Sequence, residues 1–110
     1  MRRAPGTATK LPELTEKQWQ NQVTSLAKTL GYKVYHTFLS RWSDAGFPDL
    51  VLVGHRVIYA ELKREKGKCT ESQAGWIRDL RLAGAEVYVW RPSDWDEVVE
   101  VLQRRGRAGV

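Results

Sequence analysis

The stretch that decides the fold is Gly46-Phe47-Pro48-Asp49-Leu50-Val51-Leu52-Val53, followed by Gly54-His55-Arg56 and then Val57-Ile58-Tyr59-Ala60-Glu61-Leu62-Lys63. The run 50–53 is short and wholly apolar, as expected for a strand buried at the centre of a sheet. Residues 57–63 form a second strand-like run after a short turn, so the two strands are predicted to pair as a hairpin. An acidic residue opens the first strand, and an acid and a lysine lie near the end of the second.

These charged residues are predicted to meet at one point. Side chains alternate across a strand, so Glu61 and Lys63 share a face, and Asp49 reaches the same place if the two strands are neighbours. Two carboxylates and an ammonium form a site for a hard divalent cation and an activated water. The backbone carbonyl of Leu62 is a further candidate metal ligand. The chemistry that most often needs such a site is phosphodiester hydrolysis.

The same residues have a purely structural alternative, in which Glu61 and Lys63 form an ion pair and Asp49 caps a turn. A carboxylate on a buried strand is costly unless it is paired or bound to a metal, and either interpretation removes that cost. The order of Pro-Asp, apolar strand and Glu-x-Lys favours the catalytic site.

The rest of the chain predicts three helices and two further strands. Thr15 with Gln18, and Thr70 with Gln73, are capping-box patterns that begin two helices, which end at glycines 31 and 84. Strands are predicted over 33–38 and 86–90. A last helix runs to about residue 103; Ser93 or Asp94 caps it, and Val98, Val99 and Leu102 face inward.

The predicted class is therefore α/β, in the order helix, three strands, helix, strand, helix. Because the fourth strand follows a helix, it needs a crossover and should lie parallel to a neighbouring strand. The expected architecture is a small mixed four-stranded sheet flanked by helices.

Length and composition narrow the class of protein. A chain of 110 residues is long enough for one compact core. No apolar run approaches the roughly 18 residues that span a membrane, and no secretory signal is recognisable, so we expect the cytoplasm, or the host cytoplasm if the gene is viral. The single cysteine, Cys69, excludes an internal disulfide and a zinc cluster.

The basic excess lies at the two ends. The net charge is +5, from 18 basic and 13 acidic residues, and six of the basic residues fall before residue 11 or after residue 103. We expect a flexible basic lead-in over 1–12, a folded domain over 13–103 and a basic tail over 104–110. Such tails suit loose contact with a polyanion such as DNA, although they are also common solubilising ends.

Two segments beside the acidic residues are candidates for DNA contact. Ser40 and Arg41 can hold phosphates, and Trp42 can stack on an unpaired base. Arg64, Lys66 and Lys68 extend the charge of Lys63 into a local positive segment. The alternatives are an ordinary surface loop and a solvated charged face.

Pro48-Asp49 followed by Glu61-Leu62-Lys63 resembles the motif of the PD-(D/E)XK nuclease superfamily. The longer series of 46–50, 60–63, Gly67 and Gln73 resembles the VRR-NUC domain, the virus-type replication-repair nuclease domain, and in particular its short stand-alone phage proteins. The resemblance implies a restriction-endonuclease-like fold and Mg²⁺- or Mn²⁺-dependent cleavage of DNA, often of branched or flapped structures.

The resemblance also implies roles for single residues. Asp49 and Glu61 would be metal ligands, Lys63 the catalytic lysine, and Gln73 a supporting glutamine that can also serve its capping box. Many relatives carry an acid on the first helix near the metal. The candidates for that position are Glu16, Gln20 and Gln22.

Three functions follow, in decreasing order of support. The first is a metal-dependent DNA endonuclease that selects branched, flap or junction DNA in replication or repair; the small size of the chain makes a homodimer plausible. The second is a module of the same fold that binds DNA ends or junctions without cutting them. The third is an accessory protein of a replication complex, tethered by its basic tails.

Overall fold

The fold was analysed in a computed structural model, which describes residues 13–37 and 44–104. Its elements follow the predicted order. They are α1 (Glu16–Thr29), β1 (Lys33–His36), β2 (Leu50–Val53), β3 (Val57–Leu62), α2 (Glu71–Leu82), β4 (Glu86–Trp90), a 3₁₀ turn η2 (Pro92–Asp94) and α3 (Trp95–Gln103). Within the described ranges, no helix is long and apolar enough to cross a membrane.

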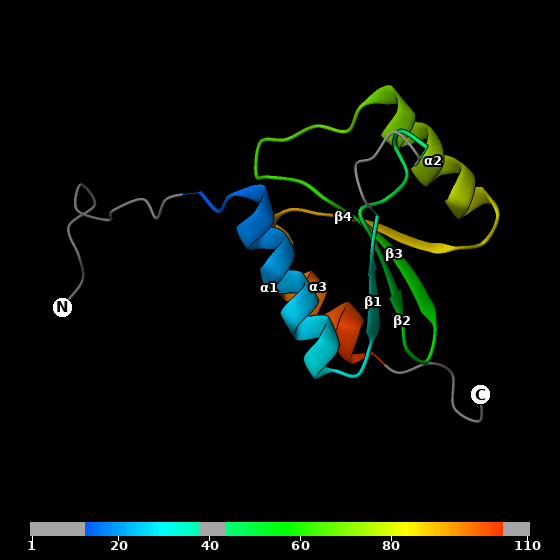
Figure 1. The fold of residues 1–110 in the computed structure, drawn as a ribbon. Helices are drawn as coiled ribbons and strands as arrows, with labels where there is room; N and C mark the ends of the chain where they lie inside the picture. The colour runs from blue at the N-terminus through cyan, green and yellow to red at the C-terminus, as the bar shows by residue number, and fades with distance from the viewer. Residues whose placement is uncertain (1–12, 38–43, 105–110) are drawn as a thin grey trace.

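The four strands form one mixed sheet in the order β1-β2-β3-β4 (Figure 1). β1 with β2 and β2 with β3 are antiparallel pairs, and a short turn over residues 54–56 joins β2 to β3. β4 lies parallel to β3 because α2 carries the chain back to the end of the sheet at which β3 begins. The α/β class and the mixed four-stranded sheet were both predicted correctly.

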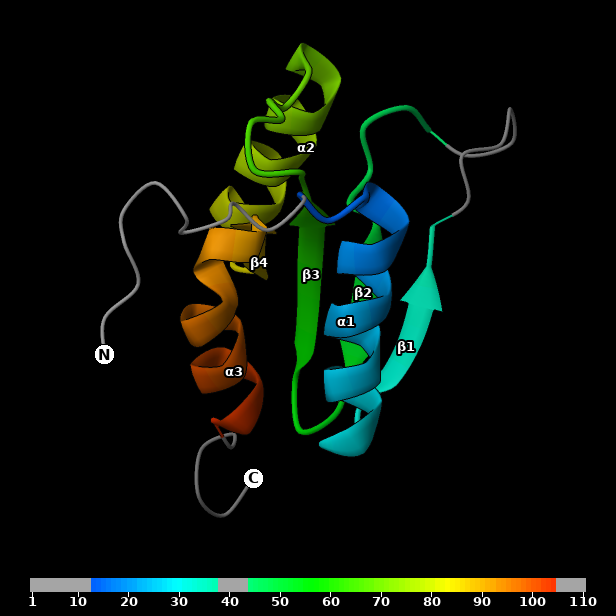
Figure 2. The same ribbon diagram turned by 90° about the vertical axis from the view of Figure 1, so that its left-hand side faces the viewer.

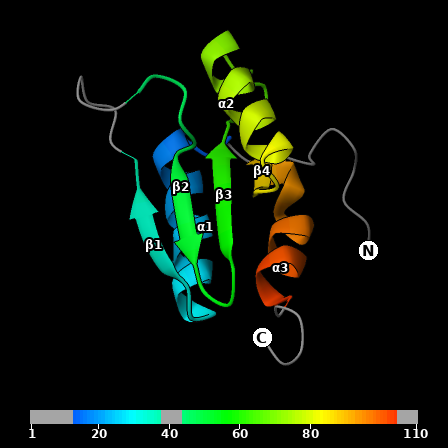
Figure 3. The same cartoon turned by 90° about the vertical axis from the view of Figure 1, so that its right-hand side faces the viewer.

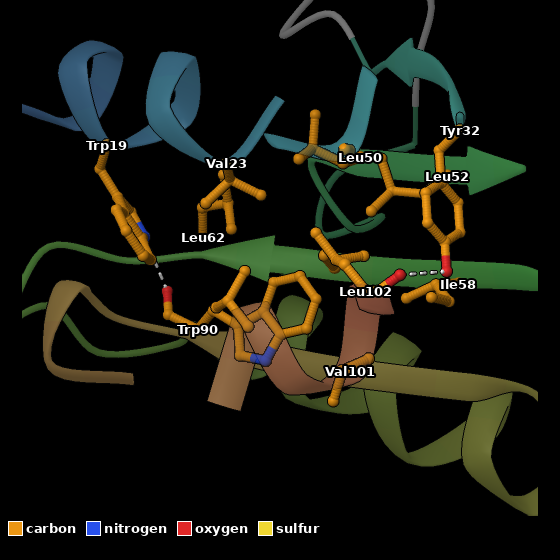
Figure 4. Close-up of a cluster of buried hydrophobic side chains, with 13 residues drawn as sticks. Trp19, Val23, Tyr32, Leu50, Leu52, Ile58, Leu62, Trp90, Val101 and Leu102 are labelled. Atoms are coloured by element: carbon orange, nitrogen blue, oxygen red, sulfur yellow. Dashed lines mark hydrogen bonds between the residues drawn. The ribbon is translucent and has the colours of Figure 1, made fainter. Parts of the chain in front are cut away.

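Helices cover both faces of this sheet. α1 and α3 lie together on one face, and α2 lies against the other, near the end where β3 finishes (Figures 2 and 3). Alternate residues of β3 point into the α1 and α3 side, where Ile58, Ala60 and Leu62 are fully buried. The Trp19 indole N–H donates to the carbonyl of Trp90 over 3.0 Å, which fixes α1 to the end of β4 (Figure 4).

Both predicted capping boxes form. The hydroxyl of Thr15 accepts the Gln18 N–H, and the Gln18 side chain accepts the Thr15 N–H. Thr70 and Gln73 make the same reciprocal pair at the start of α2. Each pair satisfies two N–H groups that a helix start otherwise leaves open, so both helices begin at the predicted residues.

The last helix differs in two details from the prediction. Asp94 stands at its start, but the Asp94 carboxylate accepts the N–H of Arg91 instead of a helix N–H. The buried residues of the helix are Val98, Val101 and Leu102, whereas Val99 is half-buried. Val98, Val101 and Leu102 are three and four residues apart, so they share one face of the helix, and this is the face that packs on the core.

The end of α3 is held by an arginine from the β2–β3 turn. The Arg56 guanidinium pairs with the Glu86 carboxylate at 2.6 Å and donates to the backbone carbonyls of Val101 and Arg104. Burial alone would raise the pKa of Glu86, but the hydrogen bonds from Arg56 and Tyr88 outweigh it and hold the pKa below its ordinary value. One side chain therefore joins the hairpin, β4 and the carbonyl end of α3.

We expect Arg56→Met to lower the free energy of unfolding by about 2–3 kcal/mol, because it leaves a half-buried carboxylate and two helix-end carbonyls without their donor. Urea unfolding followed by tryptophan fluorescence measures the loss. Arg78→Met is the control, since Arg78 is exposed and pairs only with its neighbour Asp79; it should change stability by less than about 0.5 kcal/mol. Equal losses in the two variants would contradict this role of Arg56.

Candidate metal and nucleic-acid site

The register of β2 and β3 brings the two predicted carboxylates together. Leu50 pairs with Ala60, so Asp49, one residue earlier, lies level with Glu61, one residue later. Residues opposite each other in an antiparallel pair point to the same face. Leu50 and Ala60 point into the main core, so Asp49 and Glu61 project on the other face, toward α2.

Asp49 is fixed at both its side chain and its backbone. One carboxylate oxygen accepts the N–H of Leu62 at 2.9 Å, and its carbonyl accepts the N–H of Thr37 at 2.8 Å. The path of the chain that leads to Asp49 depends on Gly46. Its φ is 91°, and a Cβ atom at this position would lie 2.5 Å from the backbone of Ser72. Only glycine allows the chain before Asp49 to touch the first turn of α2.

Glu61 is the most buried charged residue of this site, with 1% of its surface exposed. Its Oε2 accepts the Gln73 side-chain N–H at 2.9 Å and lies 3.4 Å from the Lys63 ammonium. Its Oε1 is buried and has no hydrogen-bond partner among the described residues. A buried carboxylate oxygen without a partner is costly, so this atom marks a place for a further positive group.

The pKa of each of the two carboxylates is raised. Burial, followed by the nearby charge of Asp49, raises the pKa of Glu61 to about 7, although Lys63 opposes the change. Burial also raises the pKa of Asp49, against the hydrogen bond from Leu62, and the charge of Glu16 adds to the increase. Full ionisation of both carboxylates is therefore unfavourable in the protein alone.

Gln73 makes both of its predicted contacts at once, one in the capping box and one toward the end of the sheet. Its amide oxygen accepts the Thr70 N–H in the capping box, and its amide nitrogen donates to Glu61. A residue in the first turn of α2 therefore also ties that helix to the end of β3. A glutamate in its place could serve the cap but could not donate to Glu61.

The donors present suit a divalent cation, with two carboxylates as the core of the set. Asp49, the free oxygen of Glu61 and the backbone carbonyl of Leu62 are the hard oxygen ligands such an ion prefers. In the parts of the chain that the structure describes, no three His, Cys, Asp or Glu side chains gather tightly enough to hold a metal. Glu16, at the start of α1, lies near enough for its charge to raise the pKa of Asp49. Gln20 lies one turn further along α1 and is half-buried.

Of the predicted DNA contacts, only the segment after β3 is described. Arg64 is exposed and pairs with Glu13 at 3.5 Å, a partner that the sequence pattern did not reveal. Lys66 and Lys68 are exposed on either side of Gly67. Ser40, Arg41 and Trp42 lie outside the described residues.

Sequence reasoning also missed the side-chain bond of Asp49 to the Leu62 N–H and the contact of Arg91 with the carbonyl of Gly67. The hairpin register is the signal that could have found the first. No sequence motif indicates the contact of Arg91 with Gly67. The two residues lie far apart in the sequence and come together only because β4 lies beside β3.

The raised pKa of Glu61 predicts how stability depends on pH without metal. Between the ordinary value of 4.5 and about 7, the unfolded carboxyl has lost its proton while the folded one keeps it, so stability falls as pH rises. From pH 5 to pH 8 in EDTA, the wild type should lose about 1–3 kcal/mol more than Glu61→Gln in urea unfolding. Parallel pH profiles for the two proteins would contradict the raised pKa.

Gln73→Glu separates the two functions of this side chain. It keeps the cap but places a carboxylate against Glu61, so we expect a loss of about 1–2 kcal/mol at pH 8 and a smaller loss at pH 5. Gln18→Glu is the matched control, because it is the same change in the same capping box of α1. Thermal unfolding of both variants at the two pH values makes the comparison. Equal behaviour would mean that the contact of Gln73 with Glu61 contributes nothing.

Comparison with known proteins identifies the family and agrees with the fold. No functionally curated protein matched the chain. A solved structure described as "VRR_NUC domain protein" is 24% identical, with a TM-score of 0.69 over 84% of this chain and 88% of that one, a likeness that establishes the fold. The family model of the VRR-NUC domain matches residues 8–94. Since that match covers most of the sequence, the chain belongs to the VRR-NUC family, whose domain is of the nuclease type.

Proposed function

We propose that this protein is a metal-dependent DNA endonuclease that selects branched, flap or junction DNA. The observation that carries the proposal is the buried Oε1 of Glu61, close to Asp49, which lacks a hydrogen-bond partner in the described part of the chain. A carboxylate pair with surplus negative charge is unfavourable in the protein alone, and a divalent cation would remove the cost. The VRR-NUC membership supports phosphodiester hydrolysis as the chemistry.

Asp49, Glu61 and the carbonyl of Leu62 would hold Mg²⁺ or Mn²⁺, with Glu16 or Gln20 as a further donor. When bound, such an ion supplies Lewis acidity at the phosphodiester and makes water a better nucleophile. The hydrogen bonds that fix Asp49 and Glu61 set the positions of these oxygens before substrate arrives.

Lys63 and Gln73 complete the proposed site. The Lys63 side chain is mostly buried and its ammonium lies next to Glu61, so it can hold the attacking water or stabilise charge that develops on the phosphate. Gln73 holds Glu61 in the orientation that leaves Oε1 free. Its proposed contribution is to position that carboxylate.

The proposed DNA contacts extend from the site along the segment after β3. Arg64, Lys66 and Lys68 are exposed and follow Lys63 directly, so they can track a phosphate backbone. No helix in the described part of the chain is an evident sequence-reading element. We therefore propose that substrate choice rests on DNA shape.

Cleavage of labelled duplex, flap and four-way-junction DNA tests the proposal. Wild type with Mn²⁺ or Mg²⁺ should cut at least one of these, and EDTA should abolish cutting. Asp49→Asn and Lys63→Met should each lower the rate by about a hundredfold or more. Asp79→Asn removes an exposed carboxylate on α2 and should cut at the wild-type rate.

The other outcomes separate the alternatives. Tight junction binding by the wild type without cleavage in any metal would favour the non-cleaving module. Equal cutting by wild type, Asp49→Asn and Lys63→Met would exclude this site as the source of activity.

A further inference from the structure

The connection between β3 and α2, residues 63–70, carries the basic residues of the proposed DNA contact. It is held to the last residue of β4 and to the chain that follows by three separate contacts. The Lys63 N–H donates to the carbonyl of Trp90 at 3.0 Å, and the Ser93 N–H donates to the Glu65 carboxylate at 2.9 Å. The third contact is made by Arg91. In Figure 1 the two connections leave the sheet on the same side.

Arg91 holds the centre of this connection. Its Nε and Nη2 both donate to the carbonyl of Gly67, at 3.3 and 2.7 Å. The Gly67 N–H in turn donates to the carbonyl of Arg64 at 2.9 Å, which closes a tight turn. Lys66 and Lys68 flank the held residue, so the position of Gly67 sets where both lysines emerge.

The charge of Arg91 is unusual at this position. None of the four ion pairs among the described residues involves its guanidinium. It joins a segment that already carries Lys63, Arg64, Lys66 and Lys68 against a single acid, Glu65. A neutral donor could hold the carbonyl of Gly67, whereas the Arg91 guanidinium adds a further positive charge beside this basic segment. That charge would favour a bound polyanion.

We propose that Arg91 is a positioning residue, which fixes the Arg64–Lys68 turn so that its basic side chains contact DNA phosphates together. The inference rests on the proposed function, because it names how that site holds its substrate. It also assigns a role to the chain after β4, which carries none of the predicted site residues. Without the contact, the hydrogen bond from Ser93 to Glu65 would be the remaining one, among the described residues, between residues 64–69 and the chain after β4.

The first measurement is amide hydrogen exchange at Gly67 in Arg91→Met, without DNA. Loss of the charged donor should free the turn and raise the exchange rate by about tenfold. Arg78→Met removes an equal charge from the exposed face of α2 and should leave this rate unchanged. An unchanged rate in Arg91→Met would overturn the proposed positioning.

The second measurement is the salt dependence of four-way-junction binding in EDTA, where no cleavage occurs. Each lost phosphate contact lowers the slope of log K against log salt by about 0.9. We expect Arg91→Met to lower the slope by about two contacts or more, because several basic residues lose their position. A decrease in the slope that corresponds to one contact would mean that Arg91 itself binds a phosphate. An unchanged slope would mean that Arg91 has only a structural role. Either result overturns the proposal.

Arg91→Lys tests the same contact with the charge retained. An ammonium cannot reproduce the two-donor fork, so both effects should appear in weaker form although the net charge is unchanged. Full wild-type behaviour of Arg91→Lys would show that charge alone matters and would overturn the positioning role. If the wild type binds neither duplex, flap nor junction DNA, the proposed function itself fails, which distinguishes that outcome from the failure of Arg91→Met alone.

Discussion

The carboxylate of Glu61, buried at the end of β3, is the constraint on which the site depends. An ionised group in that position needs partners, and the chain supplies the Lys63 ammonium and the Gln73 amide, while Asp49 on the neighbouring strand adds a second negative charge. Both partners contact Oε2, and Oε1 has no hydrogen-bond partner among the described residues. The proposed function makes this incompletely paired carboxylate a metal ligand, whereas a purely structural role would leave it as one half of an ion pair.

The structural alternative for the acidic residues is realised in the atoms of the proposed site. Glu61 and Lys63 do form an ion pair, and Asp49 does accept a backbone N–H, as that alternative expects. In the site that we propose, the same contacts would also orient the carboxylates for a metal, because hydrogen bonds to ligand groups fix their orientation. A structural role and the proposed catalytic role would therefore not compete here. The raised pKa of both carboxylates is the feature that the structural role alone does not explain.

Side chains at this site each stabilise two structural elements. The amide oxygen of Gln73 caps the start of α2, and its amide nitrogen donates to Glu61. One side chain therefore fixes the start of this helix against the end of β3. The contacts between residues 63–67 and 90–93 tie the next turn of chain to the strand on the far side of β3. With few residues to bury, the protein gains order at the site from side chains that serve two neighbours.

The sequence by itself determined the order of elements, both capping boxes and the two strands that carry the acids, because these depend on local patterns of apolar residues and on pairs three residues apart. It also placed Asp49, Glu61 and Lys63 on one face, since alternation along a strand follows from backbone geometry. Only the tertiary structure decided what long-range packing controls. This includes the inward face of α3, the pairing of Arg64 with Glu13, the open oxygen of Glu61 and the reach of Arg91 to Gly67. Those contacts join residues far apart in the chain, and their geometry is set by how the elements pack together.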